Sequence, residues 1–443
     1  MSHDLQGLPV TGSAASVTAL NAAIHDYYAW KGDPVGVLQQ AAQDDPSFNL
    51  GNTAVASLLL LNGARGDALP VSSAIAAAQA QIGHGTRREQ LHLDAAKAWA
   101  AGESIRAAEL WEDILLDHPT DALALRFAHD TYFYLGHSNS IRDSVARVLP
   151  AWDTANANYG FVLGQYAFGL EEAGNLAQAE EVGRRALEIN PEDTWAVHAV
   201  AHVLEMSSRQ EEGIVFLNDT SPHWKNGRWL AVHNWWHLAV YLIEVGRAAE
   251  VLPRYDEFVR PKIKDDFILD LVDAAALLWR LELAGLYVGD RWQEIAAQWL
   301  THADDHVLVF NDLHIALAST GARDATGQQA LLKSLNHYIT EGSGDNREIS
   351  QDVGRQIVAA IVAFGQKNFQ RVIDLLWPIR YKWIRIGGSH AQRDLLSQTL
   401  IAAALGAGNN KLAKALLAER SAWRPTQRSK QLFSKVLSSR SAN

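Results

Sequence analysis

Apolar residues recur with a helical period along almost the whole chain. Stretches rich in Ala, Leu and Val place apolar positions three and four residues apart, and short turns containing Gly, Asn or Asp interrupt them. Strand-like alternation bounded by hairpin turns is not convincing anywhere in the sequence. The pattern therefore predicts an all-α protein built from consecutive short helices.

The segment 163–193 indicates how these helices pair. Its sequence is LGQYAFGLEEAGNLAQAEEVGRRALEINPED, in which Gly174 is placed to close a turn between two helices. Ala179 and Ala186 are small enough to allow close helix approach, and Pro191 is expected to end the second helix. This spacing resembles the tetratricopeptide repeat, a helix hairpin of about 34 residues.

The same spacing of glycine, alanine and proline recurs at Gly102, Ala107 and Pro119, and at Gly408, Ala413 and Pro425. One hairpin cannot bury its apolar face alone, so neighbouring hairpins are expected to stack into a right-handed α-solenoid with a concave inner face. We expect a single repeat array over 1–443. Its expected parts are degenerate N-terminal hairpins over 1–85, central repeats with a polar concave cleft over 86–325, and C-terminal hairpins and a cap over 326–443. The segment 340–346 is the best candidate for a flexible loop.

Composition narrows the class of function. The chain has 443 residues, is 48% hydrophobic and contains no cysteine, which excludes disulfides, zinc–thiolate sites, iron–sulfur clusters and a cysteine nucleophile. A net charge of −11 without a long basic stripe opposes nucleic acid as a partner. Apolar runs are too short to span a membrane, and no signal pattern precedes them, so we expect a cytoplasmic protein with no membrane partner.

Ionisable residues gather on helix faces that the repeat would turn inward. In such hairpins the first helix lines the groove through positions three and four residues apart. Trp195, His198, His202 and Glu205 share one such face. The following hairpin contributes His233, Trp236 and His237, and an earlier one contributes Arg126, His129 and Asp130.

The two histidine pairs allow more than one interpretation. His198 with His202, and His233 with His237, are four residues apart, and histidines on adjacent turns can share a divalent ion. The metal ligands would then include His198, His202 and His237, with Glu205 or Asp130 as a general base. A cleft that binds an organic ligand by hydrogen bonds and stacking, or histidines with a purely structural role, remain open alternatives.

A second candidate is the segment RYKWIRIGGSHAQRD, 380–394. Gly387 and Gly388 predict a tight turn, and Ser389 is a natural N-cap for a following helix. With basic residues upstream, the helix start is suited to a carboxylate or phosphate, although an ordinary capped turn is the plainer interpretation. No Ser-His-Asp triad can be assigned from spacing, because triads are recognised by geometry.

The strings AHDTYFYLG (128–136), WAVHAVAHVLEM (195–206), HNWWHLAVYLIEVG (233–246), DLVDAAALLWRLELAG (270–285), FNDLHIALA (310–318) and GGSHAQRD (387–394) resemble the tetratricopeptide repeat protein 38 family. The resemblance implies a soluble α-solenoid of degenerate repeats and no established reaction. It also implies retention of the polar residues His129, Asp130, His198, His202, Glu205, His233, His237, Asp270, Asp273, Asp312, His314, Arg393 and Asp394.

Together these observations predict a binding protein whose central cleft, lined by His, Trp and Asp, recognises a compact polar ligand or a peptide terminus. The expected ligand-binding residues are Arg126, His129, Trp195, His233, Trp236, Asp270, Asp273, Asp312, His314, His390 and Arg393. The alternatives are a metal-dependent hydrolase or lyase, and a plain protein–protein scaffold. The only cofactor that the sequence indicates is a divalent metal.

Overall fold

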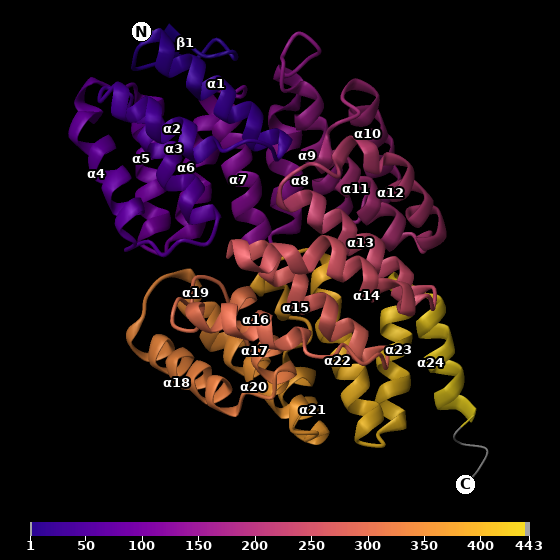
Figure 1. Ribbon diagram of the computed structural model, residues 1–443. Helices are drawn as coiled ribbons and strands as arrows, with labels where there is room; N and C mark the ends of the chain where they lie inside the picture. Colours follow the sequence, from indigo (N-terminus) through magenta and orange to yellow (C-terminus); the bar gives the residue numbers. More distant parts are fainter. Residues whose placement is uncertain (1, 439–443) are drawn as a thin grey trace. The chain divides into compact units, whose positions relative to one another are not determined.

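The computed structural model describes residues 2–438, and Figure 1 shows that helices dominate them. The prediction of an all-α fold of stacked helix hairpins is confirmed. Within the described residues the strands are β1 (Ser2–His3) and β2 (Pro9–Val10), a short antiparallel pair in which Ser2 lies opposite Val10. The helical pattern had not predicted this pair.

The described chain divides into two compact units. The first comprises residues 2–200 with 223–230, and the second comprises 201–222 with 231–438. The expected division into 1–85, 86–325 and 326–443 stays a prediction.

The first unit is a succession of antiparallel hairpins in which each helix packs on the next. Its helices are α1 (Ala14–Ala29), α2 (Pro34–Asp44), α3 (Asn49–Leu61), α4 (Leu69–Gln81), α5 (Arg87–Ala100), α6 (Ser104–Asp117), α7 (Ala122–Leu135), α8 (Ser138–Val148), α9 (Tyr159–Glu172) and α10 (Leu176–Ile189). Helices α11 (Thr194–Met206), α12 (Gln210–Trp224) and α13 (Trp229–Glu244) each contribute residues to both units.

The second unit continues with the same kind of packing after a short helical connection. Its helices are α14 (Val251–Arg254), α15 (Ile268–Leu283), α16 (Arg291–Trp299), α17 (Val309–Gly321), α18 (Ala325–Glu341), α19 (Asp345–Ile349), α20 (Arg355–Gly365), α21 (Phe369–Leu376), α22 (His390–Gly406), α23 (Asn410–Trp423) and α24 (Gln427–Ser438). The loop expected over 340–346 is shorter than predicted, because α18 and α19 occupy most of that segment.

The hairpin of α9 and α10 has the predicted form. Gly174 adopts a φ of 85°, and its N–H donates to the carbonyl of Glu171 at 2.8 Å, which closes the turn. A left-handed φ favours glycine because it has no Cβ. Helix α10 ends at Ile189, just before Pro191, and Ala179 and Ala186 are fully buried on its inner face.

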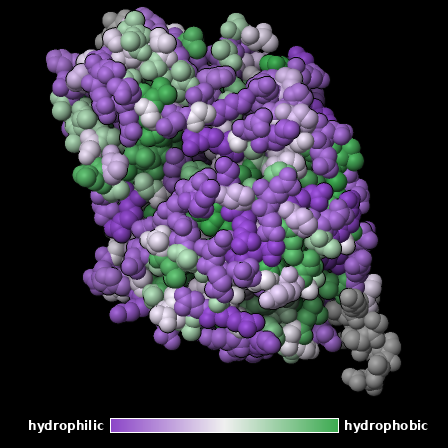
Figure 2. Space-filling view, viewed as in Figure 1, coloured by the Kyte–Doolittle hydropathy of each residue, from purple (hydrophilic) through white to green (hydrophobic). Residues whose placement is uncertain are grey.

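The surface carries few large apolar side chains. Figure 2 shows a face on which hydrophilic residues predominate and hydrophobic ones are scattered between them. Among the most exposed large apolar residues are Leu69, Tyr287 and Tyr381. Between residues 2 and 438, the helices are all too short or too polar to cross a bilayer.

Close packing of α9 on α8 predicts the effect of Gly169→Ala. A Cβ at this position would lie 2.7 Å from the Cα of Arg142, although alanine in a helix interior is normally favoured by about 1 kcal/mol. We expect overpacking to prevail and the free energy of unfolding to fall by about 1–2 kcal/mol in urea denaturation. Gly83→Ala, where nothing lies within 4 Å of the added Cβ, should be neutral. Equal stability of the two variants would contradict the packing described.

Candidate functional site

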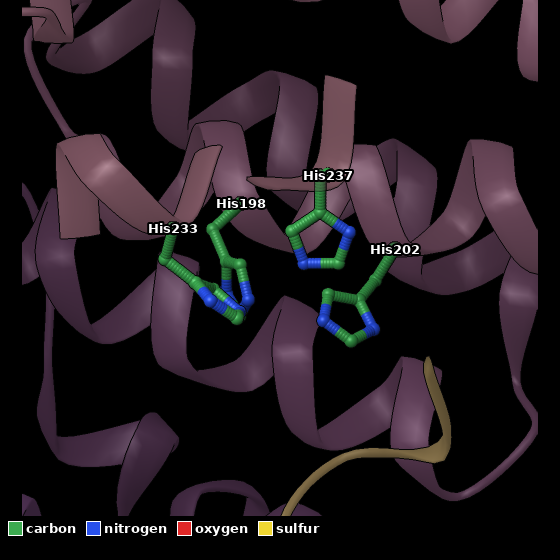
Figure 3. Close-up of side chains that lie close together, drawn as sticks. All are labelled: His198, His202, His233 and His237. Carbon is green, nitrogen blue, oxygen red and sulfur yellow. The ribbon is translucent and has the colours of Figure 1, made fainter. Parts of the chain in front are cut away.

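Helices α11 and α13 bring the two predicted histidine pairs together. His198 lies one turn before His202 on α11, and His233 lies one turn before His237 on α13. One ring nitrogen from each of the four lies within 4.8 Å of the others, and all four side chains are buried. Figure 3 shows the four imidazoles gathered between the helices. We call these residues the histidine cluster; their role as metal ligands stays a prediction.

Two of the imidazole rings, those of His233 and His237, form hydrogen bonds to carboxylates through Nδ1. The Nδ1 atom of His233 lies 2.8 and 2.9 Å from the two carboxylate oxygens of Asp273, which α15 supplies. The Nδ1 atom of His237 lies 2.9 Å from Oε2 of Glu205 on α11. A carboxylate at Nδ1 keeps the proton there and leaves the lone pair on Nε2. Asp273 was an expected site residue, whereas its pairing with His233 was not predictable from spacing.

The local electrostatics favour a neutral imidazole at His237. Burial lowers the pKa of His237 well below its ordinary value, and the neighbouring His202 and His233 lower it further. The rings of His202 and His237 have centroids 4.5 Å apart, and those of His233 and His237 are 4.8 Å apart. Two imidazolium ions at such distances would repel strongly in a buried site.

Glu205 also belongs to a buried charge network. Its Oε1 accepts a hydrogen bond from Arg424, and Arg424 donates to Oδ2 of Asp394 at 2.6 Å. Arg420 binds Asp394 at 2.7 and 2.8 Å and Glu244 at 3.0 Å. Burial alone would raise the pKa of Asp394, but Arg420 and Arg424 hold this pKa well below its ordinary range.

Arg420, Arg424 and Glu244 are members of this network that the sequence pattern does not predict. Arg424 lies 219 residues from Glu205 along the chain, so no local pattern connects them. The available signal was indirect, because an apolar hairpin that contains Glu205 and Glu244 must obtain cations from elsewhere.

Trp236 contacts His233 and Arg280 within the second unit. Its ring stacks on His233 with centroids 5.1 Å apart and an interplanar angle of 10°. The guanidinium of Arg280 lies 5.0 Å from the Trp236 ring centroid and donates to the carbonyl of Ala391 at 2.8 Å. Burial lowers the pKa of Arg280 to about 10. Trp236 therefore fixes the His233 ring, and its predicted role in stacking on a ligand stays untested.

In the first unit, Arg126 lies among aromatic rings. Its guanidinium carbon is 4.4 Å from the centroid of Trp195 and 5.2 Å from that of Trp30, and its Nε donates to Asp130 at 3.0 Å. Asp130 also accepts a hydrogen bond of 2.5 Å from Tyr27. Asp130 is thus occupied by two donors, and its suggested role as a general base gains no support from these contacts.

His129 and Asp193 are buried in the same unit. Burial, with the nearby charge of Arg126, lowers the pKa of His129 well below its usual value. Asp193 caps α11 by accepting from the backbone N–H groups of Trp195 and Ala196, both at 3.0 Å. Burial nevertheless raises the pKa of Asp193 to about 7.

Other expected ligand residues have partners of their own. His314 Nδ1 donates to the carbonyl of Phe310 at 2.7 Å, and burial lowers its pKa to about 4. Asp312 binds His306, a residue that is not among those expected from the sequence. Asp270 is buried on α15. The expected residues thus occupy several separate polar groupings within the two units.

The turn before α22 has the predicted cap. Ser389 accepts from the N–H of Gln392, and the Gln392 side chain accepts from the N–H of Ser389 at 2.9 Å. Arg393 donates to the carbonyl of Gly387 at 3.2 Å and lies 3.2 Å from His390 Nδ1.

Basic residues upstream of this turn form ion pairs within the protein. Lys382 and Arg385 both pair with Asp352, at 2.9 and 2.5 Å. These basic groups serve internal contacts, and anion binding at the start of α22 stays a prediction.

No family model matches the chain. Among solved structures, it is similar to human IFIT1, determined as a dimer with m7Gppp-AAAA, at 12% identity and a TM-score of 0.36, over 88% of this chain and 89% of that chain. It is also similar to a chain in the structure of Naa15/Naa10 bound to HypK-THB, at 13% identity and a TM-score of 0.27, over 95% of this chain and 65% of that chain. At these scores neither likeness indicates a function.

The raised pKa of Asp193 predicts a dependence of stability on pH. Between about pH 4 and 7 the folded state binds a proton at Asp193 that the unfolded chain releases, so the free energy of unfolding should fall as pH rises through this range. Asp193→Asn keeps the capping oxygen and removes the titration. We expect it to be more stable than the parent at pH 8, by up to about 4 kcal/mol, and similar near pH 4. Urea denaturation at both pH values measures this; a difference independent of pH would contradict it.

The charge network predicts that Arg424→Met is strongly destabilising. Removal of this guanidinium leaves Glu205 and Asp394 buried with fewer cations, which costs about 3–5 kcal/mol for a buried pair. The double variant with Glu205→Gln should recover part of the loss, because one uncompensated charge is removed with it. Chemical denaturation of the four proteins in this cycle gives the coupling. A loss below about 1 kcal/mol for Arg424→Met would refute the network.

Proposed function

We propose that this protein is a tetratricopeptide-type binding protein whose compact polar ligand is a divalent transition-metal ion held by the histidine cluster. The observation that carries the proposal is the pairing of buried imidazoles with buried carboxylates. His233 and His237 each have a carboxylate at Nδ1, and His202 and His198 lie beside them. This is the usual arrangement around metal-bound histidine.

The chemistry of the cluster selects a class of metal. Imidazole nitrogen suits zinc, copper, nickel, cobalt and iron, whereas magnesium and calcium prefer oxygen. Histidine must be neutral to bind a metal, and the lowered pKa of His237 meets that condition at neutral pH. The negative charges of Glu205 and Asp273 behind the rings would offset part of the charge of the ion.

Burial favours a compact ligand over a peptide terminus. The side chains of His202, His237, Glu205 and Asp273 are inaccessible to solvent, and an extended peptide needs an open groove. A single ion makes no such demand, because local opening of the helices can admit it. The cluster therefore supports the first half of our expectation, a compact polar ligand, more than the second.

The metal-dependent enzyme is not favoured by a specific contact. Glu205 uses one oxygen for His237 and the other for Arg424, so neither is placed as a general base. We also propose membership of the tetratricopeptide repeat protein 38 family, supported by the ordered motifs between 128 and 394. A cytoplasmic location and the absence of a nucleic-acid partner stay predictions.

Elemental analysis of the full chain, purified without a His-tag, tests the metal. We expect about one zinc, iron, cobalt, nickel or copper ion per chain, and loss of it in the double variant His202→Ala/His237→Ala. His314→Ala is the matched control, because His314 is also buried but bonds the Phe310 carbonyl, and this variant should retain the metal.

If the protein is purified without metal, binding can be measured by adding metal to it. Cobalt(II) added to such protein should give the visible spectrum of a nitrogen-ligated ion. Zinc at a hundredfold excess over its dissociation constant should raise the free energy of unfolding by about 2.7 kcal/mol. If the folded parent chain contains no metal and gives no cobalt spectrum, the proposal is overturned.

A further inference from the structure

Ser334, His306 and Asp312 form a hydrogen-bonded chain within the second unit. His306 lies in the turn before α17, Asp312 lies in the first turn of α17, and Ser334 lies on α18. The Nδ1 atom of His306 is 3.0 Å from Oδ1 of Asp312, and its Nε2 atom is 2.8 Å from Oγ of Ser334. We call these three residues the serine–histidine–aspartate group.

The hydrogen bonds determine which tautomer the ring adopts. Asp312 accepts at Nδ1, so the proton of a neutral ring lies there and Nε2 accepts from the Ser334 hydroxyl. Burial raises the pKa of Asp312, while its hydrogen bond to His306 opposes that rise. The order is that of a nucleophile, a base and an orienting carboxylate.

Burial follows the same order. Asp312 is inaccessible, His306 is 5% exposed and Ser334 is partly exposed, so the hydroxyl is the member that a substrate can reach. Contacts on other sides hold the imidazole in place. The ring of Tyr338, one turn beyond Ser334 on α18, stacks on it with centroids 5.2 Å apart, and Asn346 donates to the His306 carbonyl at 2.6 Å.

The backbone of His306 is unusual as well. Its φ of 45° lies in the left-handed region, which a non-glycine residue adopts only when its surroundings enforce it. This conformation directs the imidazole between Asp312 and Ser334, where both ring nitrogens are used.

We propose that Ser334 is a nucleophile for carboxylic esters, with His306 as its general base and Asp312 as the residue that positions His306. In the first step the bond between Ser334 Oγ and the acyl carbon forms, and the hydroxyl proton passes to Nε2 of His306. The bond from the acyl carbon to the alcohol oxygen then breaks, and His306 returns its proton to the departing alcohol. A water molecule, deprotonated by the same imidazole, then forms a bond to the acyl carbon. The bond from that carbon to Ser334 Oγ breaks, His306 returns the proton to Oγ, and the carboxylic acid leaves. This site is independent of the proposed metal.

Ser334 lies in the interior of α18, and this position determines which experiment tests its reactivity most directly. Its backbone N–H lies in the helix interior and does not point to a developing oxyanion, unlike that of a nucleophile at a helix start. Nucleophile activation is therefore the feature that the geometry assigns, and covalent capture reports it without requiring fast turnover.

A fluorophosphonate probe on the full chain provides that test. Attack by Ser334 forms an Oγ–P bond and expels fluoride, and mass spectrometry of the peptides locates the adduct. We expect labelling at Ser334 in the parent chain, with and without a chelator, and none in Ser334→Ala. Alanine is well tolerated on a helix, so this variant should fold. His306→Gln and Asp312→Asn should slow labelling on the order of a hundredfold or more.

Thr340→Ala is the matched control. Its hydroxyl lies on the same helix and bonds the Asn336 carbonyl, away from His306, so the labelling rate should equal that of the parent. Absence of labelling in the folded parent, persistence of the label in Ser334→Ala, or an unchanged rate in a folded His306→Gln would each overturn the proposal. In the first case the group would be a structural hydrogen-bond network that connects the start of α17 to α18.

Discussion

The compensation of charge inside helix hairpins is the constraint on which the second unit depends. Glu205, Glu244 and Asp394 are all buried on helices whose other residues are mostly apolar. An isolated buried carboxylate would be too costly to keep ionised, so cations must lie against it. The chain supplies Arg420 and Arg424, from α23 and the residue that follows it. The last hairpins thus support Glu205 and Glu244, which lie 219 and 176 positions before their arginine partners in the chain.

The same constraint reaches the histidine cluster through Glu205. One of its oxygens is held by Arg424 and the other is directed to Nδ1 of His237. Asp273 acts on His233 in the same way, while Trp236 covers the face of that ring. Two imidazoles are thereby held in a defined tautomer and orientation, as the proposed metal site would require. Such preorganisation lowers the cost of binding, because the side chains have little freedom left to lose.

Buried histidines in this protein differ in what their second nitrogen meets. His314 uses Nδ1 to satisfy a carbonyl of its own helix, as a structural histidine does. His306 has a carboxylate on one nitrogen and a hydroxyl on the other, which is an arrangement suited to proton transfer. His233 and His237 have a carboxylate on one nitrogen and face further imidazoles. Residue type and burial are alike in all these cases, and the partner atoms distinguish them.

Local sequence determined the helices and the way they pair. A 3.6-residue period, glycine at left-handed turns and proline beyond helix ends act over a few residues, so Gly174, Pro191 and the Ser389 cap could be predicted from the chain alone. The spacing of four residues within each histidine pair also placed His198 with His202 and His233 with His237 on common faces. Tertiary structure alone decided which faces meet and which charges pair: Arg424 with Glu205, Asp273 with His233, and Ser334 with His306. These contacts depend on helix packing between distant segments, and a one-residue change in the register of a hairpin would turn the same side chains elsewhere.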